Sequence, residues 1–269
     1  MTGAPDSVYI QARRVLLDAL EALREHRSAL VLVGAQAIYL RIGEGGLAVA
    51  PYTTDGDIAV DPEKLSSAPK LEDTMTAAGF VLSAQPGVWI GTGSVEIDLL
   101  VPESVGGGGR RGARLGEHGN RAARKARGLE AALVDNTSME IAALAPDDAR
   151  RFEVAVAGPA SLLVAKLHKL ADREEDAGRL EDKDALDTLR LLRAIGTGEL
   201  STELSKLADD RRSAEVTTEA IGHLQVLFGS ANAPGSKMAA RAAAPLEDPE
   251  TIAASSAALA GDLLEALGR

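Results

Sequence analysis

Cysteine is missing from this chain, and aromatic residues are scarce. With no cysteine among its 269 residues, a disulfide framework and a metal site built from thiolates are both excluded. Only seven residues are aromatic, so stacking of bases on aromatic rings is not expected to be the main way of binding a nucleic acid. Apolar residues make up 45% and charged residues 26%, which is ordinary for a globular protein of one large or two modest domains.

Long apolar runs are missing as well. No stretch approaches the roughly 20 consecutive apolar residues that span a bilayer. The first residues, MTGAPDSVYIQARRVLLDAL, have no basic start followed by an apolar stretch, which is unlike a secretory signal. We therefore expect a cytoplasmic protein without a membrane partner.

Positive charge is in short supply except in one segment. The net charge is −11, which argues against passive coating of nucleic acid. Residues 110–127 are the exception, because they hold seven Arg or Lys and one Glu, and so carry +6 against −17 for the remainder. Affinity for phosphate follows local charge, so this segment can still form a binding site.

The first part of the chain mixes helical and strand patterns. Helical spacing occurs at 7–25, 35–43 and 62–79, the last with a break near Pro69. Strands are expected at 29–34, 56–61, 132–144 and 151–158, and a meander of three short strands at 80–102. A glycine-rich loop follows the meander and is expected to become helical near Asn120. These patterns predict an α/β (α+β) domain over residues 1–157, with a mixed β-sheet flanked by helices.

The pattern changes after Gly158, where every periodic segment is helical. Pro159 suits a first helical turn, and Asp182 and Ser201 are suitable N-caps. Helices are expected at 159–178, 181–196, 201–229 and 248–268. The sequence therefore predicts a C-terminal helical bundle over residues 158–269, of which residues 200–269 match no motif that we recognise.

Three aspartates carry the clearest chemical signal. Asp55 and Asp57 point the same way along a strand, because side chains alternate between its faces. Two close carboxylates repel each other unless a cation lies between them, and Mg²⁺ prefers such oxygen ligands. Asp98 lies inside the apolar strand SVEIDLLVP, where a buried carboxylate needs a partner. If the two strands are neighbours, the three aspartates form a cluster that suits two metal ions and the displacement of a phosphoryl group.

A glycine at the junction of a predicted strand and a predicted helix precedes this acidic pair by about twenty residues. Gly34 ends a predicted strand, and a predicted helix begins directly after it. Backbone N–H groups at the start of a helix bind phosphate, and glycine allows the phosphate to come close. Along the chain, the predicted phosphate site comes first, the acidic pair second and the third acid last. This is an order in which a phosphate-binding and metal-binding site could be built.

These segments together resemble a known family. The chain resembles the DNA polymerase-β-type nucleotidyltransferase superfamily in three segments, which are LVLVGAQAI, TTDGDIAV and SVEIDLLVP. Within this superfamily, the chain is more similar to the AbiEii-type nucleotidyltransferase toxins of toxin–antitoxin and abortive-infection systems. Two helical motifs carry this closer resemblance, KLHKLADR at 166–173 and KDALD at 183–187. The resemblance covers roughly residues 29–193 and implies a nucleotidyltransferase fold.

The resemblance also implies a role for each matching residue. Metal ions would be held by Asp55, Asp57 and Asp98, with Asp98 also helping to activate the attacking hydroxyl. The nucleotide would be bound by Gly34, Ala35, Thr54 and Lys166. Asp184 would complete the far side of the site. Position 35 departs from the family pattern, because Ala35 stands where Ser or Gly is usual and a hydroxyl contact to phosphate is lost.

The activity implied is a two-metal, Mg²⁺-dependent transfer of a nucleotide from a nucleoside triphosphate to RNA. The family points to the 3′ end of tRNA as acceptor, to growth arrest as outcome and to a cognate antitoxin as protein partner. Basic side chains of the charged segment would hold the RNA backbone. They are Arg110, Arg111, Arg114, Arg121, Arg124, Lys125 and Arg127.

Simpler interpretations remain open for each of these features. Asp55 and Asp57 suit a turn, and Asp98 suits a strand edge. Lys166 and Asp184 suit solvated helix faces, and residues 110–127 suit a solvated loop. The same fold could also modify a small molecule or a protein side chain. A third alternative is a protein that binds nucleotide or a partner without turnover.

Overall fold

The short apolar runs of the first part form the strands of one sheet in the computed structural model, which describes residues 6–43, 47–109, 111–174 and 182–269. The chain divides into two units. Unit 1 consists of residues 1–37, 51–129 and 136–157, and unit 2 of residues 38–50, 130–135 and 158–269. Helix α2 (Gly34–Ile42) contributes residues to both.

Unit 1 contains an eight-stranded sheet in the order β3-β4-β5-β2-β1-β8-β7, with β6 paired to β5. The strands are β1 (Leu30–Val33), β2 (Asp55–Val60), β3 (Val81–Leu82), β4 (Val88–Ile90), β5 (Glu96–Pro102), β6 (Arg124–Ala126), β7 (Asn136–Ala142) and β8 (Arg151–Ala157). The pairs β2–β5, β1–β8 and β5–β6 are parallel, whereas β1–β2, β3–β4, β4–β5 and β7–β8 are antiparallel. The predicted mixed sheet is confirmed, and so is the meander at its β3 edge.

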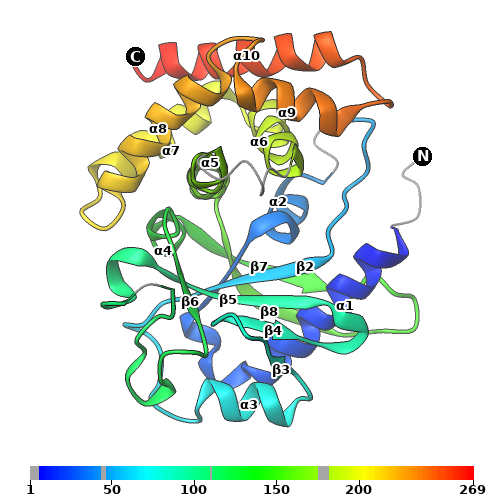
Figure 1. The fold of residues 1–269 in the computed structure, drawn as a ribbon, viewed down its shortest axis with the longest axis vertical. Coiled ribbons are helices and arrows are strands. Elements are labelled where there is room, and N and C mark those ends of the chain that lie inside the picture. Colours follow the sequence, from blue (N-terminus) through cyan, green and yellow to red (C-terminus); the bar gives the residue numbers. More distant parts are fainter. Residues whose placement is uncertain (1–5, 44–46, 110, 175–181) are drawn as a thin grey trace. The chain divides into compact units, whose positions relative to one another are not determined.

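Helices α1 (Ser7–Ala22) and α3 (Leu71–Ala77) lie beside this sheet (Figure 1). Asp6 caps α1 by accepting a hydrogen bond from the backbone N–H of Val8 at 2.7 Å. The buried face of α1 packs on β2 and β5. A Cβ on Gly56 would lie 3.2 Å from Leu16 Cδ1, so this glycine lets α1 approach the strand that carries Asp55 and Asp57. Short 3₁₀ turns occur at Arg24–Ala29, Thr92–Ser94, Glu103–Val105 and Gly116–His118.

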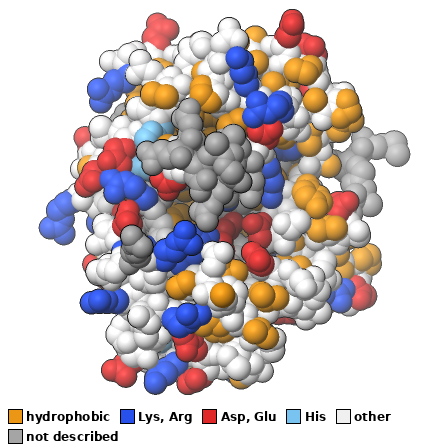
Figure 2. Space-filling model, in the orientation of Figure 1, with side chains coloured by type: hydrophobic (Ala, Val, Ile, Leu, Met, Phe, Trp, Pro, Cys, Tyr) orange, Lys and Arg blue, Asp and Glu red, His pale blue; other side chains and the backbone are white. Residues whose placement is uncertain are grey.

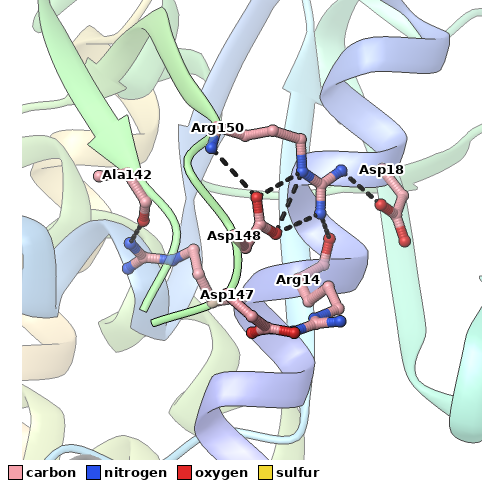
Figure 3. A network of polar contacts seen from close by, with 7 residues as sticks. Arg14, Asp18, Ala142, Asp147, Asp148 and Arg150 are labelled. Carbon is pink, nitrogen blue, oxygen red and sulfur yellow. Dashed lines mark hydrogen bonds and ion pairs between the residues drawn. The ribbon is translucent and has the colours of Figure 1, made fainter. Parts of the chain in front are cut away.

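The loop between β7 and β8 is tied to α1 by ion pairs. Arg150 lies between Asp148 and Asp18, at 2.7 and 2.5 Å, and Asp147 pairs with Arg14 at 2.7 Å (Figure 3). These contacts fix the β7–β8 hairpin to the helix that covers β2.

Unit 2 is formed mainly by helices. They are α4 (Glu130–Val134), α5 (Pro159–Glu174), α6 (Asp182–Ala194), α7 (Thr197–Asp209), α8 (Ala214–Phe228), α9 (Pro234–Ala243) and α10 (Pro249–Ala266). Helix α6 packs against α5 and α9, α5 packs against α8, and α10 packs against α9. In the part of the chain that the structure describes, no helix is both long and apolar enough to cross a membrane.

Local chemistry explains the differences from the predicted elements. The helix expected over 201–229 is two helices, because Asp210 accepts from the backbone N–H of Arg212 and Ser213 donates to Leu207 O, which stabilises a turn between them. Helix α9 was not predicted. The segment near Asn120 is a turn that leads into β6, so the helix expected there was wrong. The helix expected over 62–79 is confined to Leu71–Ala77, after Pro69.

Candidate functional site

The register of β2 and β5 brings two of the predicted aspartates together. These strands are parallel neighbours, with Asp57 opposite Asp98 and Asp55 opposite Glu96. Residues opposite each other on neighbouring strands place their side chains on the same face of the sheet. The strand of Asp98 therefore does lie beside the strand of Asp55 and Asp57, which was the condition for a cluster of the three aspartates, and Asp57 is the nearer of the two partners.

Gly34 lies directly against this pair. It occupies the junction of β1 and α2 with a φ of +69°, a conformation that side-chain-bearing residues rarely adopt. A Cβ built on Gly34 would lie 1.9 Å from Asp57 Oδ2, so that carboxylate fills the space that any other residue would need. Ala35 is buried and Thr54 is exposed. The nucleotide-binding role of these residues stays a prediction.

A buried polar network holds the backbone of Asp55. Gln36 Nε2 donates to Asp55 O at 2.9 Å, and Arg13 Nε donates to Gln36 Oε1 at 2.7 Å. Arg13 also donates to Ala142 O and to the Tyr9 hydroxyl. Burial lowers the pKa of the Arg13 guanidinium, and Tyr9 offsets part of this effect.

Sequence reasoning missed Arg13 and Gln36 as supports of the site. A signal was present, because Arg13 lies four residues from Tyr9 on the apolar face of α1, where a charged residue needs buried partners. Through these contacts α1, the start of α2 and the end of β7 jointly position β2 at Asp55. The Asp55 side chain accepts from Thr53 Oγ1.

Asp98 has a cationic partner of its own. Arg124 donates through Nη2 to Asp98 Oδ2, while Asp98 Oδ1 is buried without a hydrogen-bond partner. The Asp98 side chain is 16% exposed, so an ionised carboxylate there needs a counter-charge. Arg124 was predicted to bind RNA, and the structure places it on this aspartate.

The donor set around Asp57 and Asp98 fits a divalent cation. Carboxylate oxygens are the ligands that Mg²⁺ prefers, and the unpartnered Asp98 Oδ1 leaves one of them to be satisfied. Across the described ranges, however, no group of three or more His, Asp or Glu residues is arranged to hold a metal ion. The role of Asp55, Asp57 and Asp98 as a three-residue metal site stays a prediction.

In unit 2, Lys166 and Asp184 belong to a buried network. Lys166 Nζ lies 2.5 Å from Asp184 Oδ1 and 2.8 Å from Asp187 Oδ2. Tyr39 donates its hydroxyl to Asp187 Oδ1 at 3.1 Å, and Arg190 donates to Val49 O at 2.6 Å.

The exposures and pKa values of this network are those of an interior ion pair. Lys166, Asp184 and Asp187 are 4%, 2% and 1% exposed. Burial alone would lower the pKa of Lys166, but Asp184 and Asp187 outweigh it and raise that pKa well above its ordinary value. Burial, followed by the charge of Asp187, raises the pKa of Tyr39.

The solvated-face interpretation is therefore wrong for Lys166 and Asp184, whereas their predicted roles in the reaction stay predictions. The Lys169 side chain is 39% exposed, and its Nζ lies 3.5 Å from Asp184 Oδ2, so Lys169 is the solvent-exposed member of the pair of lysines. Asp187 and Arg190 were missed as members of the network. Their spacing was the signal: Asp187 follows Asp184 by three residues and Arg190 follows Asp187 by three, and residues three apart are neighbours on a helix surface.

The basic segment divides into bound and unbound side chains. Arg121 donates to the carbonyls of Ser83 and Ala84, Lys125 donates to those of Gly107 and Gly109, and Arg127 pairs with Glu103 at 3.5 Å.

Arg111 and Arg114 are exposed, and the hydrogen bonds and ion pairs of the described residues do not engage their side chains. Arg110 lies outside the described residues. On the face drawn in Figure 2, basic side chains lie among acidic ones, as expected of an acidic protein with local positive charge.

Comparison of the chain with protein-family models, with curated proteins and with solved structures gives no match.

Proposed function

We propose that this protein is a Mg²⁺-dependent nucleotidyltransferase that transfers a nucleotide from a nucleoside triphosphate to RNA. The proposal includes the polymerase-β-type fold, membership of the AbiEii-type toxins, a C-terminal helical bundle and a cytoplasmic location. The tRNA 3′ end is the proposed acceptor, and growth arrest the proposed outcome.

One observation carries the proposal. Asp57 lies opposite Asp98 on neighbouring parallel strands, and Gly34 at the start of α2 lies directly against the Asp57 carboxylate. Two carboxylates beside the start of a helix, where backbone N–H groups favour phosphate, are the minimum that metal-assisted phosphoryl chemistry needs. The order of these elements along the chain supports it further, since the resemblance to the family depends on the same three segments.

The chemistry follows from that placement. The acceptor hydroxyl attacks the α-phosphorus and gives its proton to Asp98, the bond from the α-phosphorus to the oxygen that bridges to the β-phosphate breaks, and pyrophosphate leaves. Mg²⁺, when bound, supplies positive charge to the oxygens that enter and leave. Asp57 and Asp98 would hold the cation, and the N–H groups at the start of α2 would orient the triphosphate. Gln36 and Arg13 would keep Asp55 in place through its backbone.

The acceptor is proposed from the basic segment. Arg111 and Arg114 are exposed in a chain that is otherwise acidic, and guanidinium groups suit phosphate geometry. With so few aromatic residues, contacts to backbone and shape would dominate over base stacking, as they do for structured RNA.

The decisive experiment is incubation with total RNA and each labelled nucleoside triphosphate in turn. We expect one nucleotide to be incorporated into a small RNA, and Asp57→Asn to reduce incorporation by at least about a hundredfold, as loss of a transition-state charge partner does. Asp73→Asn is the matched control, since Asp73 is exposed at the start of α3. Full incorporation by Asp57→Asn would refute the metal assignment.

A second candidate is favoured by the Asp98–Arg124 pair. A carboxylate that keeps an arginine as permanent partner would bind nucleotide or a protein without turnover. Release of pyrophosphate that depends on Mg²⁺ separates the two, because a binding protein releases none. If pyrophosphate is released without RNA labelling, and replacing the exposed Arg111 and Arg114 with alanine leaves this release intact, the acceptor is a small molecule or a protein.

A further inference from the structure

The ion pair between Arg124 and Asp98 brings a cation of the protein itself into the proposed metal site. Arg124 belongs to β6, which pairs in parallel with β5, the strand of Asp98. Its Nη2 donates to Asp98 Oδ2, and its own Nε is buried without a hydrogen-bond partner. The two side chains are 34% and 16% exposed, so water screens the pair only in part.

The remaining atoms around the pair show that it is only partly satisfied. Asp98 Oδ1 is buried and unpartnered, as is Arg124 Nε. A guanidinium that bound this carboxylate bidentately would engage both oxygens. Here one oxygen of the acid and one donor of the base stay unused, which is the geometry of a contact that a stronger partner can replace.

We propose that Arg124 is an internal counter-ion that competes with the divalent cation for Asp98 and so sets the cation concentration at which the site fills. This inference rests on the proposed function, because it concerns the same carboxylate. A divalent ion that binds Asp98 must displace the guanidinium or bind beside its positive charge, and both cost free energy. The freed guanidinium, with a planar set of donors, is then available to phosphate.

The test measures Mn²⁺ binding directly, by the electron paramagnetic resonance signal of the free ion. We expect Arg124→Gln to bind Mn²⁺ about tenfold more tightly than the wild type, or ~1.4 kcal/mol. Arg121→Gln is the matched control, because it removes the same charge from the same segment but its side chain donates to backbone carbonyls rather than to Asp98. In the Asp98→Asn background, Arg124→Gln should give no gain.

The outcomes separate this inference from the proposed function. If the wild type binds Mn²⁺ and Arg124→Gln binds it equally or more weakly, the competition is overturned while the metal site stands. An equal gain in Arg121→Gln would also overturn it, since the effect would then be one of general charge. If neither the wild type nor Arg124→Gln binds Mn²⁺, both the metal site and the competition are wrong.

A measurement on the wild type does not depend on how the variants fold. The NMR signals of the Arg124 side chain, assigned by their change in Arg124→Lys, should shift as Mg²⁺ is added to the intact protein. Signals that stay unchanged while Mg²⁺ binds would show that the cation does not compete with Arg124, and would overturn the inference.

Discussion

The two units handle buried acid in opposite ways. In unit 2, Asp184 and Asp187 are almost fully buried and share Lys166, with Tyr39 donating a further hydrogen bond. In unit 1, Asp57 and Asp98 are only partly buried, and one oxygen of Asp98 is without a partner. The two aspartates of unit 2 are paired within the protein, whereas in unit 1 Asp98 Oδ1 has no hydrogen-bond partner among the described residues.

A carboxylate whose oxygens are all paired within the protein is expected to serve the fold. One with an unpaired oxygen is a candidate for binding a ligand. Breaking a buried pair leaves an uncompensated charge, which costs several kcal/mol. A partly exposed carboxylate is stabilised by water, so its loss costs little stability but can remove a binding site. The two networks should therefore respond differently to the same kind of substitution.

The largest effect is expected at Lys166. Replacing it with methionine keeps the length of the side chain but leaves Asp184 and Asp187 without their shared cation, so we expect Lys166→Met to lose about 3–5 kcal/mol of stability. Denaturant unfolding followed by far-UV circular dichroism measures this loss. Lys169→Met should lose less than about 1 kcal/mol, because Lys169 is substantially exposed.

The pH dependence of that difference has a definite sign. The folded pKa of Lys166 is raised, so its contribution is fully present at neutral pH and disappears only as pH rises through that raised value. If Lys166→Met and Lys169→Met lose equally small amounts of stability, the buried pairing of unit 2 contributes little, and the expected difference between the two units is wrong.

Sequence patterns predicted the mixed sheet because its strands are short apolar runs bounded by glycine and proline. Asp98 could be singled out because an acid inside the apolar run around Leu99 needs a partner, but its register opposite Asp57 came only from the structure. The order of strands along the sheet could not be read in the same way, since β1 pairs with β8, more than a hundred residues away. Such long-range pairing depends on packing and leaves little trace in local periodicity.

The second largest effect is expected at Gly34. Alanine there must adopt a φ of +69° and must displace the Asp57 carboxylate, so Gly34→Ala should lose about 3 kcal/mol. Gly79→Ala is the control, because Gly79 also has a positive φ but nothing lies within 4 Å of a Cβ there. It should lose only about 1–2 kcal/mol. Unfolding followed by the fluorescence of Trp89, the only tryptophan and a buried residue of unit 1, measures both.

Equal losses at Gly34 and Gly79 would mean that Asp57 moves aside easily, and would weaken its assignment as a fixed ligand. The contacts within the site, like the order of the strands, could not be predicted from the sequence. Gly34 and Asp57 were recognised separately, but their contact depends on β1 and β2 being antiparallel neighbours, with Val33 opposite Asp57. The supports Arg13 and Gln36 depend on tertiary contacts that residue type alone does not specify.

A smaller effect is expected from a carboxylate of a third kind. Asp148 is partly exposed but firmly paired, and its hydrogen bonds from Arg150 lower its pKa to about 2 (Figure 3). Because the folded pKa is depressed, its contribution is present above its ordinary value of about 4 and is lost as pH falls through about 2. Asp148→Asn should therefore lower the melting temperature at pH 7, and this difference should shrink as the pH falls through about 2. A constant difference at all pH values would indicate lost packing instead of lost charge.

The smallest effect is expected in the salt dependence of RNA binding, where the basic segment can be divided in the same way as the acids. Arg121 and Arg127 are already paired within unit 1, whereas Arg111 and Arg114 are exposed and have no such partner among the residues that the structure describes. Each phosphate contact contributes about 0.7–0.9 to the slope of log affinity against log salt. Replacing Arg111 and Arg114 with alanine should therefore flatten the slope by about 1.5. The Arg121 and Arg127 double variant should change it less, and Mn²⁺ binding should stay the same in both. An unchanged slope in the first variant would show that these two arginines are solvated side chains, and would favour a small-molecule or protein acceptor.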